Sequence, residues 1–315
     1  MPMADFTIKQ FSPALKQEWD SFVAISRNGT FLHKRDYLGY HADRFPDASL
    51  MIYRDGKLHA LLPATFNGTI FSSHAGLTYG GLLLNDKGTT AEVLHIMQLL
   101  RSHVSSLGAE SFIYKPVPHI YHHLPTEEDL YALFRMNANI VARNVAAVVD
   151  ASHPLKPRNI RKAGMRKATQ AGIVIEESTD FSTFWQILST NLMERYGASP
   201  VHTLDEIIRL KSLFPSEIRL HTAHKDGKMI AGVVAYAGPR VAHMQYISAT
   251  PEGKSLHALD LLFHHLLTSE YAGTPFFDFG TSNEDSGRTL NESLIYQKEG
   301  FGARAIVYDT YSIPL

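Results

Sequence analysis

YRDGKLHALLPATF (Tyr53–Phe66) and HKDGKMIAGVVAYA (His224–Ala237) are the two stretches of this 315-residue chain that decide its fold. Asp55-Gly56-Lys57 in the first stretch recurs as Asp226-Gly227-Lys228 in the second, 171 residues later. Asp-Gly between apolar runs predicts a β-hairpin, because glycine readily adopts the positive φ that a tight hairpin turn requires. The two stretches therefore predict the same hairpin twice.

The similarity extends to the residues before each hairpin. Phe31-Leu32-His33 resembles Pro200-Val201-His202, and Phe45-Pro46 recurs as Phe214-Pro215, both at an offset of 169 residues. A hairpin alone is common, but matching residues at nearly the same offset indicate an internal repeat.

The same order of elements is predicted after each hairpin: a strand, an amphipathic helix, a short strand, a helical segment and a last strand. In the first half these are Leu77–Leu84, the stripe Val93, Ile96, Met97, Leu100 and Val104, then Ser111–Tyr114, Glu127–Met136 and Asn144–Val149. In the second half they are Ala242–Ala249, the stripe Leu256, Leu259, Leu262, Phe263 and Leu266, then Phe276–Phe279, Leu290–Glu299 and Ala305–Tyr311.

This interleaving predicts an α/β chain (α+β with mixed sheets) made of two tandem domains. The polar, proline-containing stretch Asp150–Arg158 marks the boundary, so we expect domains at residues 1–150 and 151–315. We expect the second domain to be the catalytic one.

The composition of the chain excludes several classes of function. The chain has no cysteine, which excludes disulfides and thiolate nucleophiles, and its formal net charge of −1 gives no general attraction to DNA. No signal-type segment and no membrane-length apolar run is present, so we expect a cytoplasmic protein without membrane insertion. The 17 histidines include no HExxH spacing, so no metal site is expected.

Three segments of the second half carry a resemblance to a known family. They are RNIRKAGMRKATQAGIVIEE (Arg158–Glu177), NLMERYGASPVH (Asn191–His202) and FFDFGTSNEDSGRTLNESLIYQKEGFGA (Phe276–Ala303). Together with the element order, they resemble the tandem GNAT-fold acyltransferases of the FemAB-like type. The resemblance covers Arg158–Tyr311 and reaches the first half through the repeat.

The resemblance implies an enzyme that moves an acyl group, acetyl or aminoacyl, from a thioester or ester donor to an amine acceptor. In this family some members use aminoacyl-tRNA to extend peptidoglycan precursors, and others act in acyl-CoA-dependent or polysaccharide-linked chemistry. A role in cell-wall or surface-polysaccharide precursor metabolism is therefore one expectation. A tRNA-dependent peptidyltransferase and a non-catalytic scaffold with degenerate domains are the alternatives.

The sequence does not identify the acyl donor. GNAT enzymes that use acyl-CoA usually hold its pyrophosphate on a glycine-rich loop at a helix N-terminus. Thr250–Ser255 (TPEGKS) and Asn85–Thr90 (NDKGTT) each keep a single glycine of that loop. Acyl-CoA is thus a possible donor, and its expected contacts are Ser248, Gly253, Lys254 and Ser255.

Two residues are expected to carry the chemistry. Asp278 lies among phenylalanines in a predicted interior strand, where a carboxylate is costly unless it is paired or bonded. We interpret it as a base or substrate anchor, and the competing interpretation is a structural carboxylate bonded to the backbone amides of Thr281–Asn283. Lys298 stands where family members carry a lysine near the acyl donor, which implies a charge for a carboxylate or phosphate. Neither residue has a counterpart in the first half.

Further polar residues lie on predicted loops or strand ends and are expected to contact substrate. They are Lys115, His119, Tyr121, Arg195, Tyr196, His202, Tyr246, Ser282, Asn283 and Asn291. Because His202 recurs as His33, a structural duty is the competing interpretation for that histidine. The basic run Arg158–Lys167 is either a solvated helix face or a set of phosphate contacts to tRNA.

Overall fold

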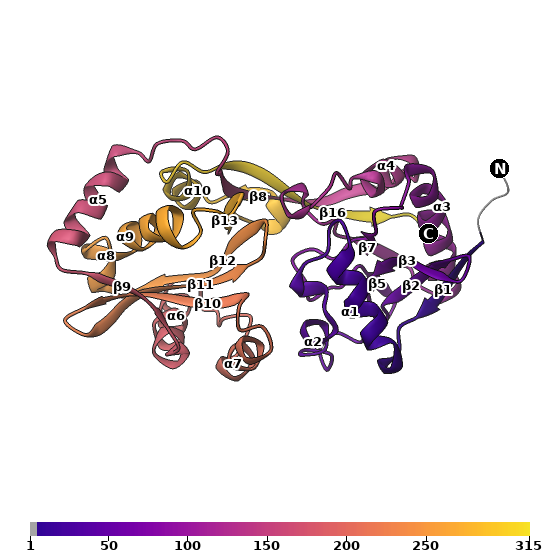
Figure 1. Cartoon of the computed structure of the whole chain (residues 1–315), viewed down its shortest axis with the longest axis horizontal. Coiled ribbons are helices and arrows are strands. Elements are labelled where there is room, and N and C mark those ends of the chain that lie inside the picture. Colours follow the sequence, from indigo (N-terminus) through magenta and orange to yellow (C-terminus); the bar gives the residue numbers. More distant parts are fainter. Residues whose placement is uncertain (1–4) are drawn as a thin grey trace. The chain divides into compact units, whose positions relative to one another are not determined.

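The computed structural model describes residues 5–315, apart from the side chain of Tyr196. The chain divides into two compact units (Figure 1). Unit 1 takes the chain up to Asn144 together with Asp285–Thr289 and Val307–Leu315, and unit 2 takes Val145–Glu284 and Leu290–Ile306. The domain limit that the sequence placed at residue 150 stays a prediction.

Unit 1 contains the four-stranded sheet β1-β2-β3-β6 and a second run of paired strands in the order β4-β5-β7-β16. Its elements are β1 (Phe6–Gln10), α1 (Lys16–Ile25), α2 (Arg35–Leu38), β2 (Leu50–Arg54), β3 (Lys57–Leu62), β4 (Thr65–Asn67), β5 (Ile70–Ser72), β6 (Leu83–Leu84), α3 (Thr90–Ser106), β7 (Ser111–Tyr114), α4 (Glu128–Arg135) and most of β16 (Arg304–Ile313).

Unit 2 is built around one sheet, in the order β8-β13-β12-β11-β10-β9. Its elements are the second half of β8 (Asn139–Asp150), α5 (Asn159–Gln170), β9 (Val174–Ser178), α6 (Phe181–Tyr196), α7 (Leu204–Leu213), β10 (Ile218–Lys225), β11 (Lys228–Ala237), β12 (Val241–Ala249), α8 (Pro251–Ser255), α9 (Ala258–His265), β13 (Phe276–Thr281) and α10 (Glu292–Glu299). The short strands β14 (Asn283–Glu284) and β15 (Thr289–Leu290) pair with each other. In Figure 1, α6 and α7 cover one face of this sheet, and α5, α8 and α9 cover the other.

The predicted hairpins are confirmed. β2 pairs with β3 and β10 pairs with β11, each antiparallel through an Asp-Gly turn. Asp55 and Gly56 have φ of 49° and 75°, and Asp226 and Gly227 have φ of 50° and 74°. Two successive positive φ angles match the right-handed twist of the flanking strands, which is why Asp-Gly suits both turns.

The sequence predicts that the last strand of each half belongs to the sheet of that half, and this prediction is wrong. Residues 145–150 of β8 complete the sheet of unit 2 by pairing with β13, for example Phe277 with Val149. The C-terminal strand β16 completes a sheet of unit 1, where Tyr311 pairs with Tyr114 of β7. Strand patterns identify a strand but not its partner, because either apolar sheet edge accepts it.

The third predicted strand of the first half is also wrong. Leu77–Leu84 forms a strand at Leu83–Leu84 alone, and β5 lies earlier, at Ile70–Ser72. Between them residues 73–82 form a loop in which His74 and Gly81 have φ of 64° and 63°. The matching prediction in the second half, Ala242–Ala249, is confirmed by β12.

Each unit has its own apolar core. In unit 1 the predicted stripe of α3 is buried throughout, and packs with Phe71, Phe112 and Tyr114. In unit 2 the predicted single helix is divided, because His257 has φ of 59° between α8 and α9 and a π-helical turn, Leu266–Glu270, follows α9. None of the helices in residues 5–315 combines the length and the apolar character that crossing a bilayer requires.

Candidate active site

The candidate site lies in unit 2, where two parallel strands part. β12 and β13 pair at Val241–Phe276, Ala242–Phe277 and His243–Asp278, and the register ends there although both strands continue. Two residues later, at Gln245, β12 bulges, since Val234 of β11 faces Tyr246 while Ala235 faces Met244. A bulge bends and twists its strand, so it carries β12 away from β13 just beyond the last pair.

The last registered pair brings a histidine and a carboxylate together. His243 Nδ1 lies 2.8 Å from Asp278 Oδ2, and Asp278 Oδ1 accepts the Gly280 N–H at 2.7 Å. Because a carboxylate only accepts, the proton of neutral His243 sits on Nδ1 and Nε2 keeps its lone pair. Asp278 is fully buried, as predicted from its apolar neighbours, and His243 carries the accessible end of the pair.

Lys298 approaches the same strand end from α10. Its Nζ donates to the carbonyl oxygens of Gly280 at 3.0 Å and Thr281 at 2.7 Å. Burial lowers the pKa of Lys298 to about 8, against the charge of Asp278, which raises it. The third N–H of this ammonium has no acceptor among the described residues, so it is available to a bound carbonyl.

Gly280 joins these groups through its backbone. Its φ of 73° is a conformation that other residues rarely adopt, and a Cβ there would stand 3.3 Å from His243 Cε1. A side chain at this position would therefore press on the imidazole that Asp278 holds.

Unit 1 has a parallel strand pair at the matching place but closes it with its own chain. β5 and β7 pair at Ile70–Ser111, Phe71–Phe112 and Ser72–Ile113, so Ser72 and Ile113 stand where unit 2 has His243 and Asp278. The loop of residues 73–82 then returns to the end of β7, where Gly80 N–H donates to Lys115 O at 3.0 Å.

Lys115, predicted to contact substrate, is held by that loop. Its Nζ donates to the carbonyl oxygens of Ala75 and Leu77, and its N–H donates to Ser73 Oγ at 2.8 Å. Burial lowers the pKa of Lys115 to about 8. Substrate contact by this lysine stays a prediction.

The segment predicted to bind acyl-CoA is satisfied internally. Thr250 Oγ1 accepts the Gly253 N–H at 3.0 Å, and Lys254 Nζ donates to Asn191 Oδ1 at 2.5 Å. Asn191 in turn donates to Ser248 Oγ at 2.8 Å, and Ser255 Oγ donates to the carbonyl of its own helix at 2.9 Å.

Packing alone accounts for the glycine at position 253. A Cβ on Gly253 would stand 2.2 Å from Ile230 O, so α8 can lie this close to β11 only with glycine there.

His202 and Tyr246 meet beneath α6. His202 Nδ1 is hydrogen-bonded to Tyr246 Oη, the His202 N–H donates to the same hydroxyl at 3.2 Å, and Trp185 Nε1 donates to His202 O at 3.3 Å. Burial raises the pKa of Tyr246 to about 12. Unit 1 repeats part of this arrangement, since Trp19 Nε1 donates to His33 O at 2.8 Å.

The segment after β13 places three predicted residues together. Ser282 is buried, its N–H donates to Val145 O, and its Oγ has no hydrogen-bond partner among the described residues. Asn283 Oδ1 accepts the Val145 N–H at 2.9 Å. Asn291 caps α10 by accepting the Leu294 N–H at 3.1 Å, which fixes the helix that carries Lys298.

The remaining predicted residues lie elsewhere. His119 and Tyr121 form a short turn in unit 1, with His119 exposed and Tyr121 hydrogen-bonded to Tyr308 Oη at 3.2 Å. Arg195 is exposed in the last turn of α6, and the side chain of its neighbour Tyr196 lies outside the described part of the chain.

His243 is the residue that sequence reasoning missed. It stands in the predicted strand AHMQYISA like any other half-buried strand residue. Its importance comes from the register that places it opposite Asp278, and one sequence does not specify that register.

Unit 2 has the mixed sheet of the GNAT fold, with a parting parallel pair, a bulge beside the parting point and helices on both faces, and unit 1 repeats the parallel pair. Residues 156–286 match the family model described as Acetyltransferase (GNAT) domain. The matched segment lies almost wholly in unit 2, so the similarity to the GNAT acetyltransferase domain is carried by that unit.

Solved structures agree on the fold. The crystal structure of FemX is similar with a TM-score of 0.71 at 11% identity, covering 98% of this chain and 97% of that one. The C-terminal domain (DUF2156) of a putative lysylphosphatidylglycerol synthetase from Agrobacterium fabrum gives 0.63 at 13%, covering 96% and 92%. A tandem GNAT protein from the clavulanic acid biosynthesis pathway gives 0.51 at 13%, covering 98% of both. No curated protein matches the chain by sequence.

Proposed function

We propose that unit 2 transfers an aminoacyl group from an ester donor to an amine, with His243, Asp278 and Lys298 as its chemical groups. The observation that carries this proposal is their convergence where β12 and β13 part. His243 Nε2 is the base, Asp278 is the positioning residue that holds the imidazole, and the Lys298 ammonium is the electrophilic group. No covalent intermediate is needed, which suits a chain without cysteine.

The reaction follows from these roles. The amine nitrogen attacks the donor carbonyl carbon, and His243 Nε2 takes the proton that the nitrogen loses. The Lys298 ammonium stabilises the negative charge that forms on the carbonyl oxygen. The ester C–O bond then breaks, the imidazolium returns its proton to the leaving oxygen, and an amide remains.

The N-terminus of α8 favours an ester donor over acyl-CoA. A pyrophosphate there would need backbone N–H groups, but Pro251 has none and the Gly253 N–H is bonded to Thr250. Lys254 is also paired with Asn191. FemX and the putative lysylphosphatidylglycerol synthetase are the similar folds whose names support aminoacyl chemistry.

Aminoacyl-tRNA is the ester donor that the basic helix α5 supports. Arg158 and Arg161 are used inside unit 2, through ion pairs with Glu299 and Asp260. Lys162, Arg166 and Lys167 form no ion pair with any acidic residue in the described part of the chain, so they remain available to phosphates. An acceptor in cell-wall or surface-polysaccharide precursor metabolism is the part of this proposal that rests on the family resemblance alone.

The test compares two donors and one matched pair of variants. The protein is incubated with tRNA charged with a labelled amino acid mixture, or with acetyl-CoA, and with a lysine-containing peptide, an amino sugar or phosphatidylethanolamine vesicles as amine. We expect label to move from tRNA to an amine, and His243→Gln to lower that rate at least about 100-fold. Ser72→Ala, at the matching place in unit 1, leaves it unchanged.

Each arm has a result that contradicts one claim. Acetyl transfer without aminoacyl transfer would overturn the choice of donor. A His243→Gln variant as fast as the parent would overturn the role of His243. The third arm measures the initial rate of transfer as the salt concentration rises from 50 to 200 mM. A rate that does not fall over this range would overturn the claim that α5 binds phosphates.

A further inference from the structure

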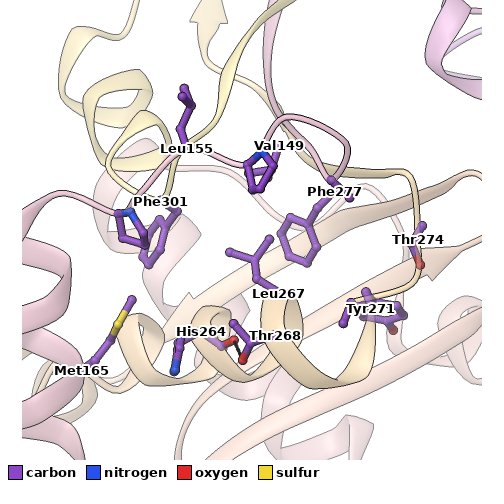
Figure 2. A pocket seen from close by; sticks show the side chains of 14 residues that line it. Val149, Leu155, Met165, His264, Leu267, Thr268, Tyr271, Thr274, Phe277 and Phe301 are labelled. Atoms are coloured by element: carbon purple, nitrogen blue, oxygen red, sulfur yellow. Dashed lines mark hydrogen bonds between the residues drawn. The ribbon is translucent and has the colours of Figure 1, made fainter.

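Unit 2 contains a pocket of about 290 Å³ that the acyl-transfer proposal does not use. Its wall is mainly apolar and includes Val149, Leu155, Met165, Leu267, Phe277 and Phe301. Figure 2 shows Leu155 and Val149 on one side and Leu267 on the helix opposite, with Met165 at one end of the group and Tyr271 and Thr274 at the other. The lining residues therefore surround a mainly apolar pocket.

Apolar surface dominates the pocket wall, with a smaller polar share from residues such as Thr268 and Tyr271. Thr268 Oγ1, one of its few polar lining atoms, already donates to His264 O at 2.7 Å. A buried water needs two to four polar partners, whereas apolar chambers stay dry and accept hydrocarbon. At roughly twice the ~150 Å³ of a cavity that binds benzene, this chamber holds about ten carbon atoms.

Two backbone features maintain the space. The helix wall at Leu267 and Thr268 is a π-helical turn, in which Tyr271 N–H donates to Leu266 O at 2.8 Å across five residues. Such turns are rare and frequently lie at functional sites. On the other wall, Gly302 has φ of 96°, and a Cβ there would stand 2.5 Å from Leu155 O, so the loop packs directly on that glycine.

The pocket is separate from the candidate active site but shares its framework. Phe277 lines the pocket and precedes Asp278, and successive strand residues point to opposite faces of a sheet. Phe301 also lines the pocket, and its N–H donates to Lys298 O at 3.1 Å. A ligand in this pocket would contact the neighbours of Asp278 and Lys298 without touching the Asp278 carboxylate or the Lys298 ammonium.

The mouth of the pocket favours an anionic head group. Leu155 is 45% exposed and His264 and Thr268 are exposed, which places the opening between the loop and the helix. Lys156 stands between two lining residues, Leu155 and Pro157, is exposed, and forms no ion pair within residues 5–315.

We propose that this pocket binds an unbranched acyl chain of about ten carbons whose anionic head stays at the mouth beside Lys156. The chain length follows from the volume, the hydrocarbon character from the mainly apolar wall, and the charge from the lysine. The proposal does not rest on the acyl-transfer function, because a stored or regulatory amphiphile would bind here whatever the enzyme transfers.

Isothermal titration of the full chain at pH 7 tests the proposal, with decanoate below its micelle concentration. We expect one molecule bound per chain, with affinity that rises about fourfold for each methylene from hexanoate to decanoate. Ala272→Phe adds a ring at an exposed lining position and should lower decanoate affinity at least about tenfold. Leu267→Trp, which fills the chamber from the helix, should have the same effect.

Two further variants test whether the head group of the ligand is anionic. Lys156→Glu should weaken decanoate several-fold and leave 1-decanol unchanged, whereas Lys167→Glu, the same charge change on exposed α5, should alter neither. Absence of decanoate binding, or equal binding by parent and both filling variants with parental melting temperatures, overturns the pocket. Equal binding of decanoate by Lys156→Glu and parent overturns the anionic head.

Discussion

The two units build the same strand junction and use it in opposite ways. In unit 2 the parallel pair ends at His243 and Asp278, and β12 then bends away. In unit 1 the pair ends at Ser72 and Ile113, and the following loop folds back onto β7. A duplicated fold thus leaves one strand junction open and closes the other with its own chain.

The lysines make the contrast sharper. Lys298 is buried and Lys115 is half-buried, each donates to two carbonyl oxygens, and desolvation lowers the pKa of each to about 8. The carbonyl oxygens that Lys115 contacts belong to residues 73–82, the closing loop of unit 1. No carboxylate contributes to the pKa of Lys115. A lysine with a lowered pKa is therefore not what distinguishes the units, whereas the histidine–carboxylate pair is.

Loss of the Asp278 carboxylate should have the largest effect. Asp278→Asn keeps an oxygen for the Gly280 N–H but no longer fixes the proton of His243 on Nδ1, so kcat should fall about 10²- to 10⁴-fold. Steady-state kinetics with KM measured separately checks this. Asp129→Asn, a buried carboxylate of unit 1 that accepts from Tyr114 at 2.7 Å, is the matched control. An equal loss in both variants would mean that the effect is structural.

The alkaline limb of the pH–rate profile should belong to Lys298. Its ammonium is the active form, and it is lost as pH rises through about 8, so kcat should fall tenfold for each pH unit above that value. Lys298→Arg, which stays protonated, should remove the limb below pH 10 whatever its rate at neutral pH. Lys115→Met should leave the limb where it is, although Lys115 has the same lowered pKa. A limb that moves with Lys115 would assign the titration to unit 1.

The closing loop of unit 1 should tolerate no side chain at Gly80. A Cβ there would stand 1.9 Å from Ser73 O, a backbone atom, so Gly80→Ala should destabilise the protein by about 3 kcal/mol. Gly273→Ala in unit 2 has no atom within 4 Å of the new Cβ and should be nearly neutral. Urea unfolding of both variants measures the difference. A neutral Gly80→Ala would mean that the loop is not packed against the strand end.

Much of this fold follows from local signals in the sequence. Asp-Gly turns require positive φ wherever they occur, and the stripe from Val93 to Val104 buries one helix face, so both were predictable from residue types alone. The exchange of β8 and β16 was not, because a strand pattern does not name its partner. The same limit hid His243, which becomes significant through its register with Asp278.

The closing loop shows a second limit. LTYGGLLL has the composition of a strand, yet Gly80 and Gly81 allow close approach to Ser73 and Val117, and those tertiary contacts outweigh strand propensity. Asp278 was found because a carboxylate among phenylalanines is visible in the sequence, and Lys298 was found through the family resemblance, although their role in catalysis stays a proposal.

The smallest expected effect tests what the units share. Trp19 Nε1 donates to His33 O at 2.8 Å, and Trp185 Nε1 donates to His202 O at 3.3 Å. Tryptophan to phenylalanine at either position removes that hydrogen bond and should cost about 1–2 kcal/mol, with the larger loss at Trp19, whose bond is shorter. Chemical denaturation of the two variants, with activity measured in parallel, checks this. Equal modest losses of stability with unchanged kcat would assign both histidines to the scaffold, whereas a loss of kcat confined to Trp185→Phe would place His202 in the working site of unit 2.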